Sequence, residues 1–139
     1  MRLSPFTLIV GLSFAGAAVA AGMSIKDEMK AVVEPASNTL FSVGGDVDPA
    51  NGPDAAKVAD ARWQEGLKAA QALTTVAAEL NGPQKKSEPE WTQAADDFAK
   101  LSAAAEKAAQ AKDGVGFSTA ANALADTCTA CHTKYKPKT

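Results

Sequence analysis

The sequence is poor in several features on which common folds and functions depend. Its two cysteines lie three positions apart, so no disulfide can join distant segments of the chain. No stretch alternates apolar and polar residues in the manner of a half-buried strand. The 14 basic side chains are outnumbered by 16 acidic ones and form no stripe long enough to follow a phosphate backbone, so nucleic acid is not an expected partner.

The N-terminal segment has the features of an export signal. One positive charge at Arg2 precedes an apolar run over residues 6–16, and residues 18–20 (Ala-Val-Ala) form a small-x-small cleavage site. The run is too short for a comfortable membrane span, and the polar sequence from Ser24 onward contains no stop-transfer pattern. We therefore expect residues 1–20 to be a signal peptide that is removed, with no stable membrane insertion; an uncleaved anchor is the alternative.

Removal of the signal leaves residues 21–139, a length that suits one compact domain. Without Arg2 the chain has 13 basic and 16 acidic residues, a net charge of about −3. Exported proteins meet an oxidising compartment, so the close pair of cysteines must serve something other than a long-range disulfide.

Apolar residues recur at helical spacing in the first part of this domain. From Ser24 the sequence predicts a helix that ends at the glycine pair 44–45 and whose inner face is Ile25, Met29, Val32, Ala36, Leu40 and Val43. Asp54 is the expected N-cap of a second helix, which runs to about Leu80 with an inner face of Ala59, Trp63, Leu67, Ala70, Leu73, Ala77 and Leu80.

Two further helices are expected. Ser87 and Glu90 predict a capping box with Pro89 in the first turn, and the third helix extends from there to a break at residues 113–114 (Asp-Gly). The fourth helix closes the chain at Tyr135. The inner positions of these two helices are Trp91, Ala94, Phe98, Leu101, Ala105, Ala108, Phe117, Ala121, Leu124, Cys128, Cys131 and Tyr135.

Four helices of about 20 residues, each about 30 Å long and joined by short polar loops, describe an all-α, antiparallel four-helix bundle. We expect Trp63, Trp91, Phe98 and Phe117 in its core. The other inner positions are rich in alanine, so the bare bundle buries little large apolar side-chain volume, and a cofactor between the helices would supply what is missing.

Residues 128–132 read Cys-Thr-Ala-Cys-His, the attachment signature of a c-type haem. On a helix, Cys128, Cys131 and His132 have i, i+3 and i+4 spacing, so both thiols and the imidazole project from one face. Each thiol can form a thioether to a haem vinyl group while His132 ligates the iron. The sequence therefore predicts one covalently bound haem c near the C-terminal end of the last helix.

Two other uses of these residues compete with haem attachment. A thioredoxin-like dithiol normally opens a helix after a strand, whereas this pair ends the last helix of an all-α chain. A closed zinc site needs a fourth ligand, and His132 is the only histidine. Haem attachment fits the pattern better than either alternative.

The second axial position of the iron decides the function. Because there is no second histidine, bis-histidine ligation is excluded. Met29 is the candidate sixth ligand, since Met1 leaves with the signal and Met23 lies almost at the mature terminus. A thioether ligand would raise the reduction potential and suit electron transfer. If Met29 only fills a gap in the core, the sixth site is left for a small gas.

Two more residues bear on the haem pocket. Pro35 removes the hydrogen bond that would go to the carbonyl of Ala31, so we expect either a kink that aims the Met29 turn at the haem, or an ordinary bend or early helix end. Phe41 is a candidate for the pocket wall.

The C-terminal tail is basic on an otherwise acidic protein. After Asp126 it carries Lys134, Lys136 and Lys138 and no acidic side chain. Such a patch can dock an acidic redox partner. The simpler interpretation is a solvated, frayed terminus.

The pattern resembles the class II c-type cytochromes, the superfamily of cytochrome c prime. The resemblance depends on the exported four-helix chain, the motif at its C-terminal end, and Tyr135 with a basic neighbour beyond the histidine. It implies a periplasmic, bacterial monohaem protein with His132 as fifth ligand, and Met29 matches the sixth ligand of the low-spin, methionine-ligated branch. Lys136 stands where the family usually has arginine and lacks arginine's planar fork. Family members often dimerise, so a monomer or a homodimer is expected.

These inferences predict an electron-transfer carrier rather than an enzyme. It would use a haem iron ligated by His132 and Met29 and exchange electrons with redox partner proteins in the periplasm. The alternative is a five-coordinate haem protein that binds nitric oxide or carbon monoxide. A third possibility, of a different class, is a dithiol oxidoreductase.

Overall fold

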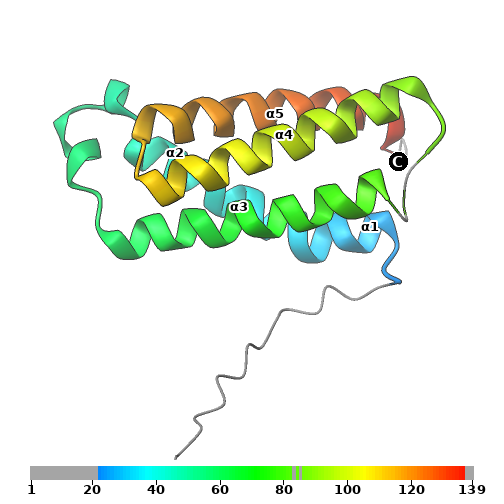
Figure 1. Ribbon diagram of the computed structural model, residues 1–139, viewed down its shortest axis with the longest axis horizontal. Coiled ribbons are helices and arrows are strands. Elements are labelled where there is room, and N and C mark those ends of the chain that lie inside the picture. The colour runs from blue at the N-terminus through cyan, green and yellow to red at the C-terminus, as the bar shows by residue number, and fades with distance from the viewer. Residues whose placement is uncertain (1–21, 83, 85, 137–139) are drawn as a thin grey trace, which may run out of the picture.

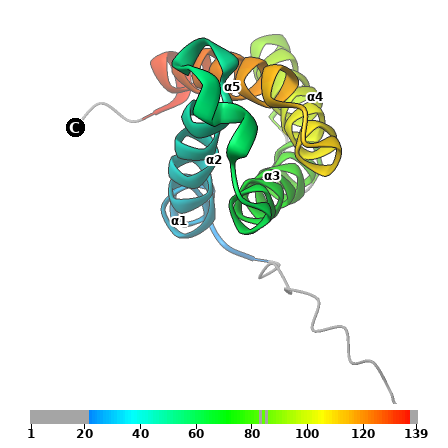
Figure 2. The same cartoon turned by 90° about the vertical axis from the view of Figure 1, so that its left-hand side faces the viewer.

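The computed structural model describes residues 22–82, 84 and 86–136, and all regular structure within these ranges is helical. Four long helical segments pack against one another (Figure 1), and Figure 2 shows them arranged around a common core. The all-α prediction is therefore confirmed, whereas the expected signal peptide, residues 1–20, lies outside the described residues. The elements are α1 (Ile25–Glu28), η1 (Met29–Val33), α2 (Glu34–Val47), η2 (Pro49–Asn51), η3 (Pro53–Lys57), α3 (Asp60–Asn81), α4 (Pro89–Ala111) and α5 (Gly114–Tyr135).

The first long segment is one continuous helix made of α1, η1 and α2. It starts at Ser24, whose hydroxyl accepts a hydrogen bond from the backbone N–H of Asp27 at 3.2 Å. Its middle part, η1, is a π-turn in which the N–H of Glu34 donates to the carbonyl of Met29. Pro35 follows at once and has no N–H to donate, so the irregularity expected from this proline takes the form of a wider turn before it.

The π-turn shifts the inward face of this helix by one residue. Its buried apolar side chains step by three or four residues from Val33 to Val47, but the preceding buried residue is Glu28, five positions before Val33. The expected inner residues Met29 and Val32 are half-buried and pack against the edge of the core. The predicted inner residues of these first turns thus lie at the edge of the core, whereas Glu28, which the prediction did not include, is fully buried.

The glycine pair 44–45 does not end this helix, contrary to the prediction, because α2 continues to Val47. Gly44 is buried, and a Cβ at this position would lie 3.1 Å from the Cβ of Ala121 on α5. The glycine therefore lets two helices approach closely and does not act as a helix terminator.

The second long segment starts later than predicted. Asp54 lies in the short 3-10 helix η3, and α3 begins only at Asp60. Val58 and Ala59 between them are extended, with ψ of 128° and 149°, and Val58 packs against the core. Ala59 is thus the exposed N-cap of α3 and not an inner residue of the helix.

The expected capping box at the start of α4 does not form. The N-cap is Glu88, without a side-chain hydrogen bond, and Pro89 occupies the first helical turn as predicted. Because a proline keeps the preceding residue extended, Glu88 becomes the last residue before the helix, and Ser87 is one position too early to cap it.

The break at residues 113–114 is confirmed. Lys112 adopts a left-handed conformation with φ of 52° and ends α4, and the Asp113 carboxylate accepts a hydrogen bond from the N–H of Gly116 at 3.0 Å to cap α5. The four predicted core aromatics are all buried, and Phe41 is 37% exposed on α2. These core aromatics are Trp63, Trp91, Phe98 and Phe117.

Gly66 of α3 provides a test of how tightly the helices pack. A Cβ there would lie 3.0 Å from both Phe117 Cζ and Val43 Cγ1, so we expect Gly66→Ala to lower the free energy of unfolding by about 1–3 kcal/mol through overpacking. Gly45→Ala is the matched control, since a Cβ there meets nothing within 4 Å and should stabilise the helix by up to about 1 kcal/mol. Urea unfolding measures both, and equal effects would contradict the packing argument.

Candidate functional site

The motif of residues 128–132 lies within the last turns of α5, as predicted. The helix continues to Tyr135, so Cys128, Cys131 and His132 keep the i, i+3 and i+4 spacing that places them on neighbouring positions of one face. Both cysteines are unbonded and half-buried, while the imidazole of His132 is exposed. The helix therefore offers two thiols from the edge of the core and a histidine next to solvent.

Burial controls the protonation of the two thiols. It raises the pKa of Cys128, and the nearby Cys131 thiol raises it further. Burial also raises the pKa of Cys131, against an opposing effect of the positive charge of Lys86. Both groups are therefore neutral thiols at pH 7. A reactive dithiol needs the opposite, a pKa lowered toward or below neutral pH.

A groove of about 390 Å³ runs along α4 and α5 beside the motif, and Cys131 reaches it. Across the groove, Lys134 Nζ lies 2.7 Å from a carboxylate oxygen of Glu90, a hydrogen bond that lowers the pKa of Glu90. Both side chains are largely exposed, so this ion pair contributes little to stability. The lining residues are Glu90, Gln93, Ala94, Asp97, Asp126, Thr127, Ala130, Cys131, Lys134 and Tyr135.

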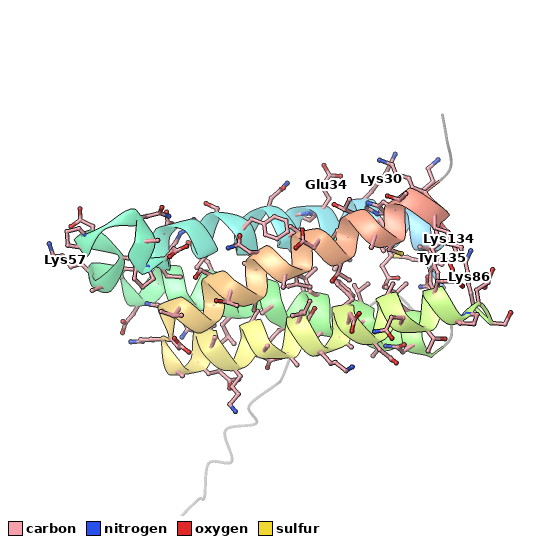
Figure 3. The ribbon with its side chains drawn as sticks, turned by 90° about the horizontal axis from the view of Figure 1, so that it is seen from above. Lys30, Glu34, Lys57, Lys86, Lys134 and Tyr135 are labelled. Carbon is pink, nitrogen blue, oxygen red and sulfur yellow. The ribbon has the colours of Figure 1, made fainter. Side chains whose placement is uncertain are left out.

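Tyr135, one of the residues that line this groove, forms an aromatic wall together with Trp91. The rings of Trp91 and Tyr135 meet edge to face with centroids 5.0 Å apart, and the Trp91 indole N–H donates to the carbonyl of Leu80 at 3.1 Å. Lys86 Nζ lies 5.1 Å from the centroid of the Trp91 ring and 5.3 Å from that of Tyr135. Figure 3 shows Lys86, Lys134 and Tyr135 together at one end of the molecule. This wall ties the connection between α3 and α4 to the last turn of α5.

The hydroxyl of Tyr135 is the one group in this wall that lacks a partner. The oxygen is buried and makes no hydrogen bond with any residue that the structure describes. A buried polar atom without a partner is uncommon, and a water molecule or another polar group would satisfy it.

Met29 lies at the same end of the molecule as the motif. Figure 1 shows α1, which directly precedes it, at the same end of the molecule as the C-terminal end of α5. Glu28 is hydrogen-bonded to Gln84 at 2.7 Å, and Lys86, two residues further on, contacts Tyr135. Met29 itself is half-buried against the core. Because His132 is exposed, the two expected axial ligands do not share an enclosed pocket in this structure.

The donor groups at this end fit a haem better than a metal ion alone. Within residues 22–82, 84 and 86–136, no group of three or more histidine, cysteine and acidic side chains could hold a metal ion. Haem attachment requires fewer protein groups: two available thiols and one imidazole at this spacing. Both thiols and the imidazole are present on α5, and the unpartnered Tyr135 hydroxyl lies close to them in the chain.

The predicted basic tail is only partly available. Lys134 pairs with Glu90, while Lys136 is exposed and its backbone N–H donates to the carbonyl of His132 at 3.1 Å. Lys138 lies outside the described residues. The prediction of a basic surface after Asp126 overlooked the acidic residue that α4 brings to it.

Sequence reasoning missed three residues at this end, Glu28, Gln84 and Lys86. The spacing of apolar residues assigned the inner position of the first turns to Met29, so a buried glutamate was not considered. The only signal for it was Pro35, whose missing N–H favours a helix irregularity one turn earlier.

None of the described helices has a segment both long enough and apolar enough to cross a bilayer.

The raised thiol pKa values can be tested by alkylation of the haem-free chain with iodoacetamide. Only the thiolate reacts, so a raised pKa means less thiolate at a given pH and slower reaction. The rate of the folded chain should therefore rise only at higher pH than the rate of the same chain unfolded in urea. Coincident curves, or a folded chain that reacts at lower pH, would contradict the burial of the thiols.

Comparison with known proteins adds no further identification. No protein-family model, curated protein or solved structure matches the chain. What supports a function is the chemistry of residues 128–132 and of the side chains around them.

Proposed function

We propose that this protein is a monohaem c-type cytochrome that carries electrons between proteins of the bacterial periplasm. Cys128 and Cys131 bind the haem covalently, His132 is one axial ligand of its iron, and Met29 is the other. The observation that supports this most directly is the pair of unbonded, half-buried thiols with the protein's only histidine on the same helical turns. The bound haem supplies the one-electron redox chemistry.

The state of the thiols favours haem attachment over dithiol exchange. Thiols with raised pKa values are poor nucleophiles at neutral pH, and a dithiol oxidoreductase depends on a lowered one. Their spacing along α5 suits two bonds to one rigid macrocycle. The chain in this proposal provides attachment points and ligands and performs no substrate chemistry, so it is a carrier and not an enzyme.

The position of Met29 supports electron transfer. Its thioether lies against the core at the motif's end of the molecule, in a π-turn, a feature that is frequent at functional sites. A sulfur ligand opposite a histidine raises the reduction potential of haem iron.

The remaining parts of the proposal follow the resemblance to class II c-type cytochromes. The four helices are taken as an antiparallel bundle, residues 1–20 as a removed signal peptide, and the protein as a monomer or homodimer without stable membrane insertion. Lys134 pairs with Glu90, whereas Lys136, directly after α5, is exposed. Of the two, Lys136 is therefore better placed to contact an acidic redox partner.

Covalent attachment is tested by maturing the full chain in cells with a haem-attachment system. Haem should stay with the wild-type polypeptide after denaturation, should be held less completely in Cys128→Ser or Cys131→Ser, and should be lost from the double variant. Thr129→Ala, which changes an exposed residue between the cysteines, is the control and should keep its haem. Wild-type protein that releases all its haem on denaturation would refute covalent attachment.

Axial ligation is tested by optical and EPR spectra of the holoprotein. Wild type should be low-spin, with the weak far-red sulfur-to-iron band, and Met29→Ala should lose that band because the variant lacks the proposed thioether ligand. Met23→Ala is the matched control and should keep it. A high-spin wild type that is unchanged in Met29→Ala and shifted by nitric oxide would instead identify a five-coordinate, gas-binding protein.

A further inference from the structure

Glu28 is the most deeply buried charged side chain in the part of the chain that the structure describes. It is 2% exposed, although it belongs to the first turn of an N-terminal helix. A buried carboxylate is costly unless hydrogen bonds replace its hydration. Its position therefore indicates a specific role for the contact it makes.

That contact is a hydrogen bond to a distant segment. The side-chain amide of Gln84 donates to Glu28 Oε2 at 2.7 Å, across 56 positions of sequence. The backbone of Gln84 is itself anchored, because its N–H donates to the carbonyl of Glu79 at the end of α3 at 2.9 Å. The bond thus fixes the first turn of the N-terminal helix to the connection between α3 and α4.

Fixing Glu28 also fixes the direction of its neighbour Met29. Successive residues on a helix point about 100° apart, so a side chain held at one position determines where the next one points. The backbone here is regular enough for this to apply, since the N–H of Glu28 donates to the carbonyl of Ser24 at 2.9 Å.

The π-turn separates the turn that holds Met29 from the packing of α2. At η1 the N-terminal turns are shifted by one residue relative to the face that α2 presents to the core. The apolar packing of α2 alone therefore does not set the direction of the Met29 side chain. Met29 also packs against the edge of the core, and the hydrogen bond between Glu28 and Gln84 adds a directional constraint to that packing.

We propose that Glu28 and Gln84 are positioning residues that hold the Met29 thioether in the orientation needed to ligate haem iron. This inference rests on the proposed function, because it assigns these residues a role toward the same iron. It predicts that the pair affects ligation through the hydrogen bond and not through the identity of either side chain.

The test compares Gln84→Ala with the reciprocal exchange Glu28→Gln/Gln84→Glu in full-length holoprotein. Gln84→Ala removes the hydrogen bond and should lower the ratio of methionine-ligated to unligated iron about tenfold, the scale for a lost hydrogen bond to a charged group. The exchange keeps one amide and one carboxylate facing each other and should restore the ligated state. The readouts are the far-red sulfur-to-iron band, the EPR spin state and the reduction potential.

Gln110→Ala is the matched control. Gln110 also donates to a glutamate, Glu106 at 3.4 Å, but on an exposed face of α4. It should leave the spectrum and the potential unchanged. A purely structural tie would show itself differently, since Gln84→Ala would then lower the unfolding temperature of the haem-free chain while the band and potential of the holoprotein stayed as in wild type.

The failures of the inference and of the proposed function can be told apart in wild type. If wild type shows the band and Gln84→Ala keeps it with an unchanged potential, the positioning role is refuted and the proposed function stands. If the reciprocal exchange fails to restore a band lost in Gln84→Ala, the hydrogen bond is not the cause and the inference is also refuted. If wild type itself lacks the band, Met29 is not a ligand, and both the positioning role and the proposed His132/Met29 ligation are refuted.

Discussion

Close approach of helices through small residues is the constraint on which the rest of this structure depends. Gly44 brings α2 against Ala121 of α5, and Gly66 lets the ring of Phe117 lie against α3. Gly114 starts α5 directly against the last carbonyl of α2, where a side chain would have no room. The helix α5 has 22 residues and is about 33 Å long. Because contacts fix it at its start and along its length, they also fix the position of its C-terminal end. The place of the cysteine motif therefore follows from contacts made a helix length away.

Polar contacts complete the end of the molecule where the motif lies. The hydrogen bond between Glu28 and Gln84 joins the first helical segment to the connection that follows α3, and Lys86 continues from that connection to the rings of Trp91 and Tyr135. The two thiols, by contrast, are half-buried, and burial raises the pKa of both, so they are uncharged at neutral pH. The polar side chains at this end thus make defined contacts, and the chemistry-bearing sulfur atoms are uncharged.

The number of helices, their approximate ranges and the core aromatics could be predicted from periodicity, because a buried face repeats with the period of the helix. The placement of the motif on α5 followed from the same rule. Helix ends were less predictable, since Gly44 and Asp54 carry the local signals of a terminus and a cap while tertiary packing decides otherwise.

The differences at the candidate site have two physical causes. A π-turn adds one residue to a helical turn, and Pro35 marks an irregularity without specifying its kind, so the register on its N-terminal side cannot be obtained by counting. Met29 was therefore placed on the inner face of the first helix, and the buried Glu28 was not considered. The contacts of Gln84 and Lys86 depend on how a short connection folds back onto two helices, which neither spacing nor charge pattern specifies.

The two tryptophans have separate surroundings, and this gives the protein built-in optical probes. Trp91 lies against Tyr135 and Lys86 in the wall beside Cys131, whereas Trp63 packs edge to face on Phe117 with centroids 6.0 Å apart. In the haem-free chain, where no haem quenches indole emission, the fluorescence of each indole depends on its immediate neighbours. Emission from Trp91 then responds to whatever loosens that wall, and emission from Trp63 responds to the packing of α3 on α5.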